Sequence, residues 1–137
     1  MTAQGTPLRP LRWLAVIGAA AFSLSAASVW ANENPDLPSK LEALRLPPYC
    51  HKQFGIPSNA PATWEVCGHL MNHFCPALVF IGRASKPTAT KFEKRFNAGR
   101  ARTDLEYTKK GMPARCSLAA DVNEADARLR VIEFFAK

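Results

Sequence analysis

The chain is organised around its central stretch, residues 64–83, which reads WEVCGHLMNHFCPALVFIGR. This stretch holds two of the four cysteines, two of the three histidines and the longest apolar run outside the N-terminus. Its apolar residues recur with a helical period and spread over roughly half of the helix circumference, which is typical of a mostly buried helix. The cysteines and histidines admit two interpretations, a metal site or the disulfide anchors and buried imidazoles of a small helical domain.

The N-terminus has the charged, apolar and small-residue order of a secretory signal peptide. Residues 1–12 carry Arg9 and Arg12 and no acid, and the apolar block WLAVIGAAAFSL follows. A small-x-small site, residues 29–31, comes next. We predict a signal peptide over residues 1–31, and therefore a periplasmic or secreted protein. The alternative is an uncleaved anchor over residues 13 to about 31, which would hold the protein at the inner membrane, facing the periplasm.

The remaining part, residues 32–137, is short enough to form only one domain, with a modest core. It carries all four cysteines. Four cysteines in an exported chain of this size predict two disulfides, because an oxidising compartment favours pairing and a small core needs covalent support. Reduced thiolates that could bind a metal are disfavoured in such a compartment.

Helical periodicity with capping and stop residues predicts three to four helices in this part of the chain. A short first helix is expected within residues 34–46, after a Pro-rich entry, and the longer ones over residues 63–82, 88–108 and 118–135. In the first helix, Ser39 is the expected N-cap, and Pro47-Pro48 ends the helix. No strand-like alternation occurs in residues 32–137. The predicted fold class is therefore all-α, as a single small bundle stapled by disulfides.

The second and third helices are expected to form an antiparallel hairpin. We predict Thr63 as the N-cap of the second helix and a kink near Asn72, because the ring of Pro76 would clash with the carbonyl there. In the third helix a stripe at helical spacing should pack on the second helix. Its members are Phe92, Phe96, Gly99, Thr103 and Tyr107.

The last helix is expected to bury one apolar face and to leave a second group of apolar residues uncovered. The buried face consists of Leu118, Val122, Ala125, Leu129 and Ile132. Val131, Phe134 and Phe135 lie off that face. Because an array of helices must cover the apolar face of its last member, we predict these three residues as a surface that binds a protein partner.

A series of short motifs runs through residues 47–130. They are Pro48-Tyr49-Cys50, Trp64 with Gly68-His69, His73-Phe74-Cys75 with Ala77-Leu78, Arg83-Ala84, Ala101 with Glu106-Tyr107, and Cys116-Ser117-Leu118. Together they resemble the N-terminal module of exported bacterial tetratricopeptide-repeat proteins. The resemblance implies a repeat-like helical scaffold for protein contacts, and a structural pair between Cys50 and Cys75. The sequence departs from the family in Pro76 and in having one more helix where the family continues with further repeats.

Four cysteines allow three pairings. The pair Cys50–Cys75 implied by the resemblance leaves Cys67 to pair with Cys116. A Cys67–Cys75 bond is disfavoured, because eight residues along a helix separate the Cα atoms by about 12 Å. Cys50–Cys67 with Cys75–Cys116 remains as the alternative.

A second function class is a periplasmic metal or haem binder. His69 and His73 are four residues apart and Glu65 is another four residues back, so on one helix the three side chains follow a line. They could bind copper or zinc, or a histidine could be an axial ligand of non-covalent haem. Cys75 falls on the opposite face and cannot join them. We favour no metal or cofactor, with the histidines hydrogen-bonded between helices.

A third possibility rests on charge. Residues 83–115 contain ten Lys and Arg against three acids. One flank of the third helix is basic and could bind a polyanion such as anionic lipid or lipopolysaccharide. Its members are Lys91, Lys94, Arg95 and Arg102. A solvated helix surface is the favoured interpretation, and export together with the lack of a stacking platform argues against nucleic acid.

Hydrolase and phosphate-loop motifs are absent from the sequence, and the four cysteines pair off without leaving a nucleophile. We therefore expect no enzyme. The sequence favours an exported helical accessory or scaffold protein that acts through protein contacts, within a larger envelope complex. The alternative is the metal or haem binder that uses the histidines of the central helix.

Overall fold

The computed structural model describes residues 34–137, so the predicted signal peptide or anchor over residues 1–31 lies outside the described part. The described residues contain helices and no strand, which confirms the all-α prediction. The elements are α1 (Lys40–Leu44), α2 (Pro48–His51), the 3₁₀ helix η1 (Lys52–Phe54), α3 (Thr63–Cys67), the 3₁₀ helix η2 (His69–His73), α4 (Phe74–Ala84), α5 (Lys91–Gly111) and α6 (Ala119–Phe135). Within residues 34–137, none of the helices combines the length and apolarity needed to span a bilayer.

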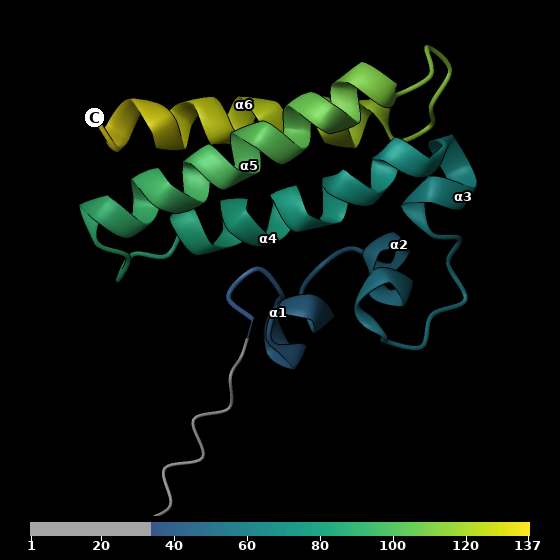
Figure 1. Ribbon diagram of the computed structural model, residues 1–137, viewed down its shortest axis with the longest axis horizontal. Coiled ribbons are helices and arrows are strands. Elements are labelled where there is room, and N and C mark those ends of the chain that lie inside the picture. The colour runs from purple at the N-terminus through teal and green to yellow at the C-terminus, as the bar shows by residue number, and fades with distance from the viewer. Residues whose placement is uncertain (1–33) are drawn as a thin grey trace, which may run out of the picture. The chain divides into compact units, whose positions relative to one another are not determined.

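The three long helices form the body of the fold (Figure 1). α4 and α5 pack as an antiparallel hairpin, and α6 turns back along α5 and also touches α4. The short helices α1 and α2 lie on the other side of α4. The largest fully buried side chains sit where α4, α5 and α6 meet, and they include Phe74, Ile81, Leu105 and Leu129.

The predicted continuous helix over residues 63–82 is wrong. Gly68 adopts a φ of 94°, a region that side chains with a Cβ avoid, and it ends α3 there. The chain continues as η2 and becomes α-helical again at Phe74. The break is stabilised across its two sides, since Thr63 Oγ1 donates to the carbonyl of Met71 at 2.9 Å and Thr63 is fully buried.

Two local predictions fail at this break. Pro76 does not kink a helix, because it lies in the first turn of α4, where its missing N–H has no partner to lose. Thr63 is not the N-cap of α3; that position is Ala62, whose N–H donates to Glu65 Oε2 at 2.7 Å. Glu65 therefore caps the helix from inside its first turn.

The predicted hairpin is present, but the third predicted helix, α5, packs through the opposite face. Its buried residues are Ala98, Ala101, Leu105 and Thr108. The predicted stripe faces outward instead, with Phe92 77 % and Phe96 52 % exposed. Small residues allow two helix axes to approach closely, and α5 uses its alanines for this contact and leaves the bulky aromatic rings outside.

The packing face of α6 agrees with the prediction. Val122, Ala125 and Leu129 are buried, and Leu118 and Ile132 are partly buried against the core. α6 is also tied to α5 by charge. Asp126 is 4 % exposed and accepts hydrogen bonds from Arg102 and Lys109 of α5 and from Arg130 of α6.

Helix α1 is short, and its place is set by polar contacts. Ser39 forms a capping box with Glu42, as its predicted N-cap role requires. Of its apolar residues only Ala43 is buried, whereas Leu41 and Leu44 are exposed. Glu42 reaches α4, where both its carboxylate oxygens accept from Arg83 at 3.1 and 3.0 Å. The hydrogen bonds from Arg83, with those from Ser39 and Lys86, outweigh burial and lower the pKa of Glu42 to about 2.

Replacing Glu42 by Gln is expected to cost roughly 2 kcal/mol of the free energy that holds α1 against α4 at neutral pH. Because the pKa of Glu42 is lowered from 4.5 to about 2, its contribution is present above pH 4.5 and is lost as the pH falls toward 2. Hydrogen exchange of the α1 amides between pH 2 and 7 measures this. The control is Glu106→Gln, since Glu106 forms no ion pair within residues 34–137. Equal α1 protection in Glu42→Gln and Glu106→Gln would contradict the prediction.

Candidate functional site

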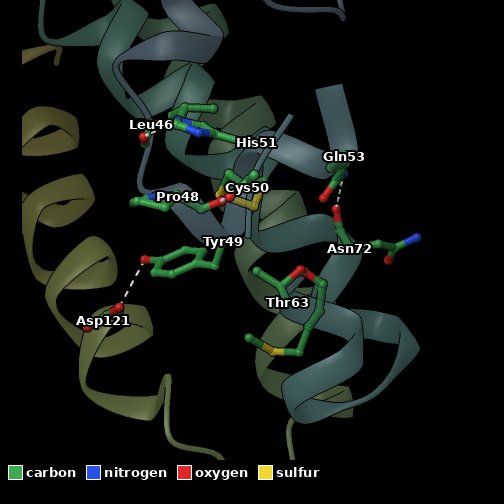
Figure 2. Close-up of a disulfide and its surroundings, with 12 residues drawn as sticks. Leu46, Pro48, Tyr49, Cys50, His51, Gln53, Thr63, Asn72 and Asp121 are labelled. Carbon is green, nitrogen blue, oxygen red and sulfur yellow. Dashed lines mark hydrogen bonds between the residues drawn. A yellow bond between two sulfur atoms is a disulfide. The ribbon is translucent and has the colours of Figure 1, made fainter. Parts of the chain in front are cut away.

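Two disulfides fix the short elements to the long helices. Cys50 of α2 is bonded to Cys75 in the first turn of α4, and Cys67 at the end of α3 is bonded to Cys116 between α5 and α6. This is the pairing that the resemblance favoured over Cys50–Cys67 with Cys75–Cys116. Figure 2 shows the first bond at Cys50, beside His51. His51 Nε2 lies 3.0 Å from the carbonyl oxygen of Leu46.

The principal cavity is a groove of about 480 Å³ that has α4 as its floor. One wall is the α1–α2 segment, which contributes Arg45, Leu46, Pro47 and Tyr49, and the other is the first half of α6. Tyr49 spans the two walls, since its hydroxyl donates to Asp121 Oδ2 of α6 at 2.9 Å (Figure 2). The floor is apolar and includes the buried Phe74, whose ring stacks on Tyr49 with centroids 6.2 Å apart.

Most polar groups of the groove already have partners. Burial and the neighbouring Asp121 carboxylate raise the pKa of Tyr49, so its phenol stays protonated and remains a donor. Arg83 and Lys86 both pair with Glu42. Arg45 and Arg128 line the same groove, and neither forms an ion pair with any residue of the described part of the chain.

The residues of the alternative metal site do not share a helix face. Glu65 lies before the break at Gly68 and pairs with Lys52 at 3.3 Å. His69 and His73 lie on η2, where three residues per turn place positions i and i+4 about 120° apart instead of about 40°. The predicted line of three side chains is therefore wrong. Within residues 34–137, no group of three His, Cys, Asp or Glu side chains is arranged to hold a metal ion.

His73 is half-buried and hydrogen-bonded between two helical elements, as the favoured interpretation of the histidines expects. Its Nδ1 lies 2.9 Å from Oδ1 of Asp104, and its ring stacks on Tyr107 of α5 with centroids 5.1 Å apart. These contacts tie η2 to α5. His69 is exposed.

The predicted partner surface is exposed on the outer face of α6. Val131, Phe134 and Phe135 are 57, 68 and 77 % exposed, and the two phenylalanine rings meet edge to face at 5.2 Å. The first turns of α5 lie next to the end of α6, because Arg95 donates to the carbonyls of Ala136 and Lys137 at 2.6 and 2.7 Å. Both of these helix ends therefore expose phenylalanines at the same end of the bundle (Figure 1).

The basic flank of α5 is divided between two roles. Arg102 is neutralised by Asp126 and by Glu133, the latter at 2.7 Å, and Arg95 caps the end of α6. Lys91 is exposed and Lys94 is half-buried. The four predicted polyanion residues thus do not form one free basic strip.

No pattern in the sequence predicts the groove. Tyr49 belongs to the Pro48-Tyr49-Cys50 motif, but nothing in the sequence links it to Asp121, 72 positions further on. Arg45 and Arg128 belong to no motif, and only the fold brings them to one cavity. Comparison of the chain with protein-family models, with curated proteins and with solved structures finds no match.

Proposed function

We propose that this chain is an exported helical accessory or scaffold protein that acts through protein contacts rather than as a catalyst. Two disulfides indicate an oxidising, extracytoplasmic environment. The resemblance to tetratricopeptide-repeat proteins supports a scaffold role, since such helical arrays present their faces to other proteins. A position in the periplasm, within a larger envelope complex, belongs to the same proposal.

The observation that carries the proposal is the apolar outer face of α6. Val131, Phe134 and Phe135 are more than half exposed and adjacent on one face. Large exposed apolar groups that gather in one place mark binding surfaces in soluble domains, and phenylalanines are frequent anchors of protein interfaces. Nothing in residues 34–137 covers these side chains, so a partner would bury them.

Replacing Phe134 and Phe135 together by Ser is expected to weaken binding of the partner by at least tenfold, because each buried aromatic anchor contributes strongly to affinity. The free energy of unfolding should change by less than about 0.5 kcal/mol, since both side chains are exposed. A photo-crosslinking residue at position 134, incorporated in cells, identifies the partner, and the purified pair gives the affinity.

The matched control is the double variant Leu41→Ser and Leu44→Ser, which removes two exposed apolar side chains from α1. It should leave the affinity unchanged. Affinity that is equal in the Phe134→Ser/Phe135→Ser variant and the wild type would remove α6 as the partner surface.

A further inference from the structure

We propose that the groove between the α1–α2 segment and α6 binds a small anionic amphiphile. Its apolar body would lie on the α4 floor, and its carboxylate or phosphate head would meet Arg45 and Arg128. The site is separate from the α6 surface proposed for the protein partner, because Val131, Phe134 and Phe135 do not line the groove.

The groove is held open by covalent and polar ties at both ends. The Cys50–Cys75 bond fixes α2 to the start of α4, and the Glu42–Arg83 pair fixes α1 to its end. The hydrogen bond from Tyr49 to Asp121 joins the α2 wall to α6. A cavity of about 480 Å³ with fixed walls is within the usual size range of small-ligand sites, and a ligand need not order it on binding.

The floor of the groove suits an alkyl chain or another flat apolar body. Phe74 and Val79 are buried there, and Leu78 is half-buried. Gly82 lies further along the floor, and a Cβ built on it would have no heavy atom within 4 Å. The space above Gly82 is therefore open, and an apolar ligand can reach the helix surface.

The charges of the groove favour an anionic head. Arg83 and Lys86 share the carboxylate of Glu42, and Asp121 accepts from Tyr49. Within residues 34–137, Arg45 and Arg128 form no ion pair, and neither do Glu124 and Asp121, whose partner is the neutral phenol of Tyr49. The lining therefore carries four cations against three carboxylates. Guanidinium groups recognise carboxylate and phosphate with paired hydrogen bonds, so an anion is the ligand that these two arginines complement.

The probe is decanoate, below its critical micelle concentration, added to the mature protein and followed by calorimetry and by NMR shifts. Decanoate should bind with one-to-one stoichiometry and shift the amides of Leu78, Gly82 and Arg128. Decyl phosphate should also bind, because the shared chemistry is the anionic head. Decyltrimethylammonium, which has the same tail and the opposite charge, should bind at least tenfold more weakly.

Two variants test separately how the apolar tail and the anionic head of decanoate contribute to binding. Gly82→Leu fills the open floor and should abolish decanoate binding, whereas Gly99→Leu, at another exposed helical glycine with open space, should leave it unchanged. Arg45→Gln with Arg128→Gln should weaken decanoate roughly tenfold and remove the preference over decyltrimethylammonium. The Phe134→Ser/Phe135→Ser variant should bind decanoate normally, so this test does not depend on the protein partner.

Three results would overturn the proposal: no binding of either anion, equal binding of the cationic probe, or unchanged binding in Gly82→Leu. An acidic amphipathic peptide that binds where decanoate does not would assign the groove to a protein segment. If the protein forms a dimer that the Gly82→Leu substitution dissociates, the groove would be assigned to a second copy of the chain. Both outcomes would also overturn the proposal.

Discussion

An Asp126→Asn variant is expected to lose about 3 to 5 kcal/mol of the free energy of unfolding. The Asp126 side chain is only 5 % exposed, and it neutralises Arg102 and Lys109, which are themselves partly buried. An amide cannot replace that charge, so two cations would be left between α5 and α6 with Glu133 as the one remaining carboxylate in contact with Arg102. Urea unfolding at neutral pH measures the loss.

The matched control is Asp36→Asn, which breaks the ion pair with Arg100 on the surface. Both partners of that pair are about half exposed, so the expected change is below about 1 kcal/mol. A loss in Asp126→Asn no larger than in Asp36→Asn would show that the α5–α6 contact depends on its apolar residues alone.

The carboxylate of Asp126 should also make the free energy of unfolding depend on pH. Burial would raise the pKa of Asp126, but the hydrogen bonds from Lys109, Arg102 and Arg130 outweigh it and hold the pKa well below its usual range. A carboxyl whose pKa is lower in the folded state stabilises the fold above its ordinary pKa and loses this contribution as the pH falls below it. The stability of the wild type should therefore fall between neutral pH and pH 3 by more than that of Asp126→Asn.

The helical periodicity of the apolar residues predicts the structural features that depend on a single segment of the sequence. The ranges of α5 and α6, the Ser39 cap and the buried face of α6 all follow from local pattern. The pattern does not predict the break at Gly68, because the apolar residues on its two sides continue a helical period although the backbone does not. A lone glycine in such a pattern is tolerated often enough that it does not predict a positive φ.

The packing face of α5 and the groove could not be predicted for a different reason. Hydrophobic content favoured the face with Phe92 and Phe96, but the contact with α4 depends on how closely two backbones approach, and Ala98 and Ala101 decide it. The groove needs side chains from α1, α2, α4 and α6. Their convergence is a property of the whole fold, and it has no signature in any one stretch of sequence.

Removing the Cys67–Cys116 bond by replacing both residues with Ala is expected to cost about 4 kcal/mol of the free energy of unfolding. The bond joins residues 49 positions apart, so its loss frees a long loop in the unfolded chain. A small domain has a total stability of about 5 to 15 kcal/mol, and this loss would therefore remove much of it. Unfolding in urea, with the double variant and the oxidised wild type side by side, gives the difference.

The companion variant, Cys50→Ala with Cys75→Ala, separates this effect from the role of the groove. Its bond spans 25 positions, so the chain-entropy model gives a smaller loss, about 3.5 kcal/mol. It should also reduce decanoate binding, because α2 is a wall of the groove and would no longer be fixed to α4. The Cys67→Ala/Cys116→Ala variant should keep that binding wherever it remains folded, since neither cysteine lines the groove. Loss of binding in both variants alike would mean that the groove depends on the stability of the whole bundle, and not on the covalent bond between α2 and α4.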